Sequence, residues 1–293
     1  MTYIIDILRG IVIGIANIIP GVSGGTMAVI LGIYEKLTTA IGDLITNRKK
    51  FKENFFFLLV IFTGVIIGIL IFAKLFVILF KINIAKQLIF IVFLGLILGS
   101  IPLIIKIHND MKPNFIRILI FLASFSALFL TSFFGANKSA ISNLNIEITG
   151  QILNIFNLAN FNIFYLIWLF IVGFFAALAM ILPGFSGSAL LVSLGEYSNI
   201  LYYIDNRLIL PLFFLGIGVL PGIFVASKII SKLLQKYPSN MYYFILGLIL
   251  GSAYQVFTGI VPIFENHLLS YFLSIFAIAF GFLISLSLSR INN

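Results

Sequence analysis

A Pro-Gly-x-Ser-Gly element occurs twice in this chain, at residues 20–24 and 183–187, and its residue types suit the binding of an anion. Each copy interrupts a long apolar run, where proline removes a backbone donor and glycine permits unusual dihedral angles. A helix that begins after such a break has N–H groups without intrahelical partners at the positive end of its dipole. Nearby hydroxyl groups add further donors. The two elements therefore predict a pair of anion-binding loops.

The candidate anion ligands lie in or beside these two loops. They are Arg9, Asn17, Gly21, Ser23, Gly24, Gly25 and Thr26 in the first copy, and Gly184, Ser186, Gly187 and Ser188 in the second. Arg9 would give a phosphate a permanent cation, or would simply anchor the chain at the membrane surface. Asn17 aligns with Met180 and could instead satisfy backbone groups that the break frees. Thr26 aligns with Ala189, so the two loops need not be equivalent. The alternative interpretation is that the glycines permit close helix packing and the prolines merely interrupt helices.

Two carboxylates follow the loops and are candidates for proton coupling. Glu35 comes directly after Tyr34, and Glu196 comes directly before Tyr197. Charged groups within a membrane are energetically costly, and they commonly mark functional sites. Either carboxylate could carry a coupling proton. The alternative is a side chain that reaches from the hairpin base to the membrane surface.

The composition identifies the class of protein. Of 293 residues, 61% are hydrophobic and 9% are charged, which is too few polar residues to cover a soluble domain. The chain has no cysteine, and its two histidines and scattered acids show no recurring ligand spacing, so we expect neither a metal nor a cofactor. The net charge of +9 falls in short loops between apolar runs. It indicates topology and contact with anionic lipid rather than nucleic-acid binding.

Further repetition indicates two copies of one helical unit. Residues 94–100 recur letter for letter as 246–252. We expect an all-α polytopic membrane protein with a first repeat at 1–136, an extracytoplasmic linker at 137–160 and a second repeat at 161–293. Each repeat would hold a broken, re-entrant hairpin and about three transmembrane helices. The expected hairpins are 3–45 and 161–206, and the expected spans are 55–80, 88–107, 115–135, 208–227, 241–262 and 268–289.

The number of crossings in each repeat predicts the relation between the two. One copy crosses an odd number of times, so the second must be inserted upside down, as in transporters with inverted repeats. Most basic residues, among them Arg48, Lys49 and Lys236, then fall on one side of the membrane. The excess of basic residues predicts that this side, with both termini, is cytoplasmic.

At these residues the chain resembles the polyprenyl-phosphate transporter family of bacterial and archaeal inner membranes. The family pattern matches Arg9-Gly10, Gly14, the run 20–26 and Gly32-Ile33-Tyr34-Glu35, and the second signature matches 183–188. The resemblance covers essentially the whole chain. It implies return of undecaprenyl phosphate, the lipid carrier of cell-wall precursors, from the outer to the inner leaflet of the cytoplasmic membrane.

Other functions remain alternatives at this point. The chain could be a secondary transporter of another anion, or an intramembrane enzyme acting on lipid phosphates, although its acids and histidines lie far apart in the sequence. A channel or scaffold is a third class. The sequence contains no feature that indicates an oligomeric state.

Overall fold

The computed structural model of the protein describes residues 2–19, 22–79, 81–106, 110–135, 162–260 and 268–291. These residues form helices and the turns that connect them, without strands. The helices are α1 (Thr2–Ile18), α2 (Gly24–Ile30), α3 (Tyr34–Asp43), α4 (Phe51–Leu79), α5 (Asn83–Lys106), α6 (Phe115–Gly135), α7 (Ile163–Ile181), α8 (Gly187–Ser193), α9 (Tyr197–Asp205), α10 (Ile209–Lys236), α11 (Pro238–Ile260) and α12 (Leu268–Ile291).

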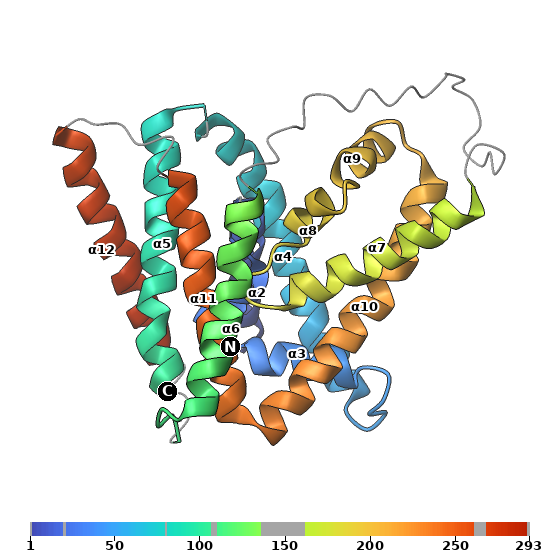
Figure 1. The fold of residues 1–293 in the computed structure, drawn as a ribbon, viewed down its shortest axis with the longest axis horizontal. Coiled ribbons are helices and arrows are strands. Elements are labelled where there is room, and N and C mark those ends of the chain that lie inside the picture. The colour runs from blue at the N-terminus through green and yellow to red at the C-terminus, as the bar shows by residue number, and fades with distance from the viewer. Residues whose placement is uncertain are drawn as a thin grey trace.

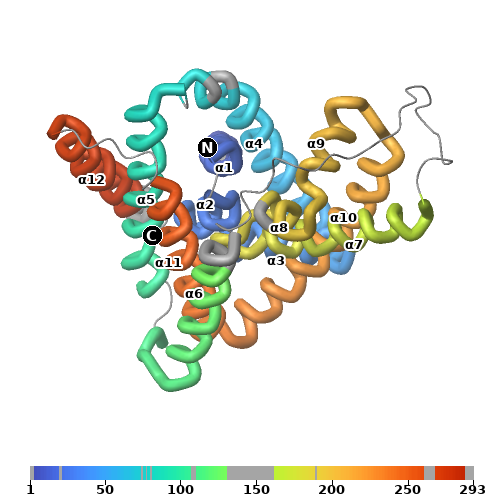
Figure 2. The backbone as a smooth tube through the Cα atoms, turned by 45° about the horizontal axis from the view of Figure 1, so that its top comes forward, coloured from blue at the N-terminus to red at the C-terminus, as the bar shows by residue number. Residues whose placement is uncertain are grey.

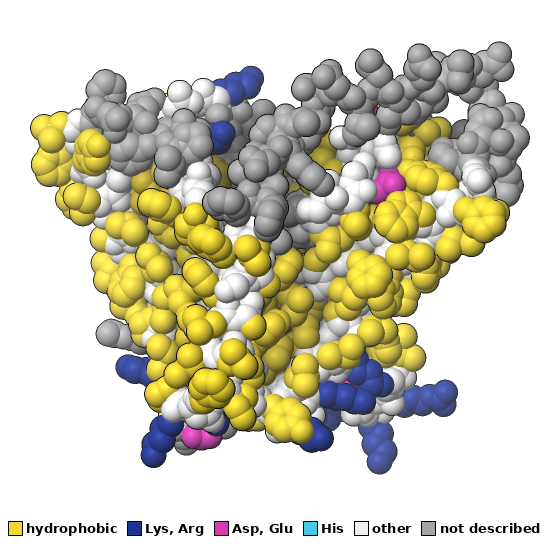
Figure 3. Space-filling model, viewed as in Figure 1, with side chains coloured by type: hydrophobic (Ala, Val, Ile, Leu, Met, Phe, Trp, Pro, Cys, Tyr) yellow, Lys and Arg dark blue, Asp and Glu magenta, His cyan; other side chains and the backbone are white. Residues whose placement is uncertain are grey.

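Helix length and composition agree with a membrane protein that crosses several times. Among the described residues, 6 helices are long and apolar enough to span a bilayer, namely α4, α5, α7, α10, α11 and α12. Helix α7, which we assigned to a hairpin arm, has 19 residues and is long enough to cross alone. A broad apolar belt covers the visible face, and basic side chains gather at its two ends (Figure 3). The chain is an all-α, multi-pass membrane protein.

Small residues set the closest helix pairs. A Cβ atom on Gly10 would clash with the carbonyl oxygen of Ile61, and one on Gly68 would clash with that of Ile11, so α1 and α4 cross with their backbones in contact. Helices α7 and α10 pack in the same way, where Gly218 lies against the carbonyl oxygen of Phe170. Close approach of backbones is how helices associate in lipid, where burial of apolar surface gives no net gain.

The two identical heptapeptides have the same packing role in different helices. Gly95 of α5 contacts Ile278 and Phe282 of α12, whereas Gly247 of α11 contacts Phe121 and Ser124 of α6. The pairs α5–α12 and α11–α6 therefore join the first half of the chain to the second. Figure 1 shows α5, α6 and α11 standing more upright, with α7 and α10 slanting away from them.

The interrupted segments lie at the centre of this arrangement. Figure 2 shows α1 and α2 between α5 on one side and α4 on the other. The sequence predicts helix breaks at 20–24 and 183–187, and α1 ends at Ile18 while α7 ends at Ile181. The helices that follow the breaks, α2 and α8, each have 7 residues. The next helices, α3 and α9, lie toward opposite ends of the molecule (Figure 1).

Candidate functional site

At the first break, side chains of the same hairpin accept hydrogen bonds from the backbone N–H groups at the start of α2. Ser23 caps α2, because its Oγ accepts a hydrogen bond from the backbone N–H of Thr26 at 3.1 Å. The Oδ1 atom of Asn17 accepts another from the N–H of Gly24 at 3.0 Å. Two N–H groups at the start of α2, which could have bound an anion, therefore already have acceptors. Asn17 satisfies freed backbone groups, which is one of the two roles expected from the sequence.

The hydroxyls of the first break also hold the second break. The N–H of Gly184 donates to Ser23 Oγ at 3.0 Å and to Thr26 Oγ1 at 2.8 Å. Both side chains are buried, with 7% of Ser23 and 1% of Thr26 exposed. The Tyr34 hydroxyl donates to the carbonyl oxygen of Ile181 at 3.1 Å; this carbonyl belongs to the last residue of α7, where helical carbonyl groups lack intrahelical partners. The hydroxyl groups of the first hairpin therefore bind backbone groups at the end of α7 and in the turn that follows it.

Glycine is required at several positions in these contacts. A Cβ atom on Gly24 would lie 2.8 Å from Asn17 Oδ1, and one on Gly25 would lie 3.1 Å from the carbonyl oxygen of Ile181. Gly184 has a φ of +81°, which favours glycine, and Gly187 leaves only 2.5 Å between an added Cβ and Met180 Cγ. Close packing therefore accounts for part of the glycine content, as the alternative interpretation expected.

The second break differs in its exposure. The hydroxyls of Ser186 and Ser188 lie 2.7 Å apart in a hydrogen bond at the surface, and the Ser188 side chain is exposed. Met180, which replaces Asn17, has no acceptor comparable to an amide oxygen, and it packs on Gly187. The second loop therefore presents hydroxyl groups to its surroundings, whereas the first keeps its hydroxyls buried.

Arg9 lies apart from both loops, near the middle of α1. Its Nη1 atom donates to Asp6 Oδ1 at 2.9 Å, and the Asp6 side chain is 5% exposed. Eight residues separate Arg9 from Asn17, which is about 12 Å along a helix axis. The sequence analysis missed Asp6, although its spacing of three residues from Arg9 on one helix was a readable signal.

The two candidate carboxylates have different surroundings. Glu196 is buried and accepts hydrogen bonds from Tyr165 at 2.7 Å, Trp168 at 2.8 Å and Asn199 at 2.9 Å. These three donors were not predicted, since two lie on α7, far from Glu196 in sequence. Glu35 is exposed at the start of α3, and the Tyr242 hydroxyl approaches it at 3.4 Å.

The structure therefore brings together only some of the predicted site residues. Ser23 and Thr26 bind Gly184, Gly25 lies against Ile181 and Leu182, and Ser186, Gly187 and Ser188 continue from Gly184 into α8. Gly21 lies outside the described residues. Within the described part of the chain, no three His, Asp or Glu side chains lie close enough together to hold a metal ion. The arrangement offers hydroxyl and backbone donors in an apolar setting, which suits an anionic oxygen ligand.

Comparisons with known proteins agree with this chemistry. The model of a family described as undecaprenyl phosphate translocase-like matches residues 13–263. A protein of Staphylococcus aureus named polyprenyl-phosphate transporter is 31% identical over 297 residues, covering 98% of this chain and 96% of that protein. A Vibrio cholerae protein of the same name is 31% identical over 264 residues, covering 86% of this chain and 77% of that protein. No solved structure matches the chain at a significant level.

Proposed function

The chain belongs to the undecaprenyl phosphate translocase-like family, and we propose that it returns undecaprenyl phosphate from the outer to the inner leaflet of the cytoplasmic membrane. A phosphate is costly to bring unaided into hydrocarbon, whereas the polyprenyl chain can stay in lipid throughout. The transporter then needs only a polar groove that opens sideways and follows the head group. No bond of the substrate is broken in this process.

The observation that carries the proposal is the surface pair of hydroxyls at the second break. Ser186 directly precedes α8 and Ser188 lies in its first turn, and their two hydroxyls are bonded to each other at an exposed position. A phosphate oxygen would accept from both hydroxyls and from backbone N–H groups of this turn. We assign head-group binding mainly to Ser186, Gly187 and Ser188.

The residues of the first break support the site rather than form it. Ser23, Thr26 and Asn17 already accept backbone donors, and Thr26 is almost fully buried. Their proposed role is to fix Gly184 and the end of α7, so that Ser186 and Ser188 stay in position. Arg9 would meet the phosphate only after leaving Asp6, at a later stage of its passage.

The orientation of the protein in the membrane is proposed from the distribution of its basic residues. Gly42 contacts Lys228, so the basic loop after α3 and the end of α10 lie at one end of the molecule. This lysine-rich end holds Arg48, Lys49, Lys50, Lys232 and Lys236. The positive-inside rule makes it cytoplasmic, with both termini. An inverted pair of repeats could then alternate access by exchanging conformations.

Proton coupling is assigned to Glu35 rather than to Glu196. Three donors hold the carboxylate of Glu196, and protonation would cost it an acceptor position. Glu35 is exposed and accepts one long hydrogen bond, from Tyr242, so a change in its charge would disturb fewer contacts.

The test is leaflet-resolved transport of undecaprenyl phosphate by purified protein in liposomes, with and without a proton gradient. The double variant Ser186→Ala, Ser188→Ala should lose about a hundredfold in head-group affinity, since each hydroxyl gives a charged oxygen a hydrogen bond worth about 1.5 kcal/mol, or about tenfold. Ser193→Ala, at the exposed end of the same helix, is the matched control. Wild-type affinity in the double variant would refute the assigned site. Release of inorganic phosphate from the lipid would instead favour an enzyme.

A further inference from the structure

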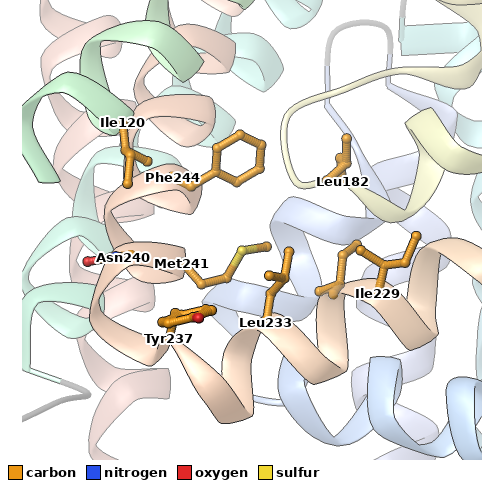
Figure 4. Close-up of a pocket in the computed structure, with 9 residues that line it drawn as sticks. Ile120, Leu182, Ile229, Leu233, Tyr237, Asn240, Met241 and Phe244 are labelled. Carbon is orange, nitrogen blue, oxygen red and sulfur yellow. The ribbon is translucent and has the colours of Figure 1, made fainter. Parts of the chain in front are cut away.

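A lateral pocket lies directly beside the second break. It has a volume of about 380 Å³ and is enclosed by α6, α10 and α11, with Leu182 entering from the loop that precedes Pro183. Figure 4 shows Leu182 reaching toward the pocket from one side, with Tyr237 and Asn240 on the other. This volume falls in the range of sites that bind small molecules.

The lining of the pocket is almost entirely apolar. Near Leu182 its wall is formed by aliphatic and aromatic side chains, including Ile229, Leu233 and Phe244. At the opposite end it is bordered by Tyr237 and Asn240, the latter accepting a hydrogen bond from Arg117 Nε at 3.3 Å. The ammonium group of Lys236 lies 5.2 Å from the ring centroid of Tyr237. The end of the pocket at Tyr237 therefore faces the lysine-rich end of the molecule, and the end at Leu182 adjoins the break.

We propose that this pocket holds the isoprenoid units nearest to the phosphate of the transported lipid. The inference rests on the proposed function, in which the phosphate binds at Ser186 and Ser188. Leu182 is only four residues before Ser186, so a head group at the break places the start of its chain at the Leu182 end of the pocket. An acyl chain of an ordinary phospholipid has no such connection, because its head group stays at the membrane surface.

The pocket would contribute selectivity rather than a large share of the affinity. A chain that moves from lipid into an apolar pocket gains packing contacts but little hydrophobic free energy, since both environments are apolar. The shape formed by Leu182, Leu233 and Met241 then decides which chains fit beside the phosphate. Met241 is suited to such a surface, because its unbranched side chain adapts to irregular neighbours.

The test uses the wild-type protein with photoreactive lipids, so that it does not depend on the folding of a variant. Undecaprenyl phosphate that carries a diazirine in its first isoprene unit should label peptides containing Leu182, Leu233 or Met241. The same lipid with the diazirine at the far end of the chain should label these peptides much less. Equal labelling by the two lipids, or by a photoreactive phosphatidylcholine, would overturn the proposal.

A pair of variants gives an independent measurement. Leu233 lines the pocket and is 39% exposed, so Leu233→Trp should fill it from the side and lower undecaprenyl phosphate transport about tenfold. Leu220→Trp is the matched control, on the same helix and 70% exposed. Equal transport by both variants, at the wild-type rate, would overturn the pocket but leave the proposed function standing. Failure of the wild-type protein to transport would overturn both.

Discussion

Removing both hydroxyls that bind the Gly184 N–H should destabilise the protein by more than the sum of the single changes. Ser23→Ala and Thr26→Val each leave one acceptor within 3.0 Å of this buried donor. Each single change should cost about 2 kcal/mol, because it removes one bond to Gly184 and the 3.0 Å bond between the Ser23 and Thr26 hydroxyls, and one hydrogen bond is usually worth about 1 kcal/mol. Ser23→Ala also removes the cap of α2, which adds about 1 kcal/mol.

The double variant leaves the Gly184 N–H buried without an acceptor. An unsatisfied buried donor costs about 1–3 kcal/mol, and about 1 kcal/mol of this is offset because each single variant already loses the Ser23–Thr26 hydrogen bond, so the coupling free energy in a double-mutant cycle should be about 1 kcal/mol. The unfolding free energy of the purified protein, measured in mixed detergent micelles against added denaturing detergent, gives all four corners of the cycle. Thr63→Val is the control, because the Thr63 hydroxyl bonds only within its own exposed helical turn.

Two outcomes would refute this reasoning. Additive losses would mean that Gly184 finds another acceptor or that the hydroxyls do not cooperate. Wild-type stability combined with loss of undecaprenyl phosphate binding would mean that Ser23 and Thr26 serve the ligand directly. In that case the two loops would act as an equivalent pair, as the repeated sequence alone suggests.

Two further predictions concern topology and protons. The chain has no native cysteine, so a single introduced cysteine reports its own position. Lys49→Cys and Lys236→Cys should be protected from an impermeant thiol reagent in intact cells, whereas Ala140→Cys should react. Labelling of all three would contradict cytoplasmic termini. Glu35→Gln should keep lipid-phosphate binding but lose the dependence of transport on an imposed pH gradient, whereas Glu196→Gln should lower stability because an amide cannot accept all three of its hydrogen bonds. Wild-type pH dependence in Glu35→Gln would remove it from the coupling mechanism.

Local sequence predicts the helices and their interruptions because the causes are local. Proline and glycine interrupt an apolar run wherever they occur in it, and a serine followed three residues later by threonine can cap the next helix. Asn17 could be assigned to freed backbone groups, since it precedes the break within two helical turns. These features require no knowledge of which segments meet.

The contacts between segments could not be derived in the same way. Gly184 is 161 residues from Ser23 and 158 from Thr26, so their hydrogen bonds depend on how the two hairpins meet. Two of the three donors to Glu196, Tyr165 and Trp168, come from α7, which looks almost uniformly apolar and aromatic in the sequence. The Asp6–Arg9 pair differs from these contacts, because its partners are only three residues apart on one helix and the spacing alone predicts it.

The differences between the two copies explain why two nearly identical loops have different roles. Thr26 supplies a second acceptor for Gly184, whereas the aligned Ala189 has no hydroxyl with which to return that contact. Asn17 caps the N–H of Gly24, whereas the aligned Met180 offers no such acceptor to Gly187. Both substitutions act in the same direction: they give the first loop internal acceptors that the second loop lacks. The departures from symmetry therefore distinguish the two loops, and they support the proposed binding of the head group at the second loop.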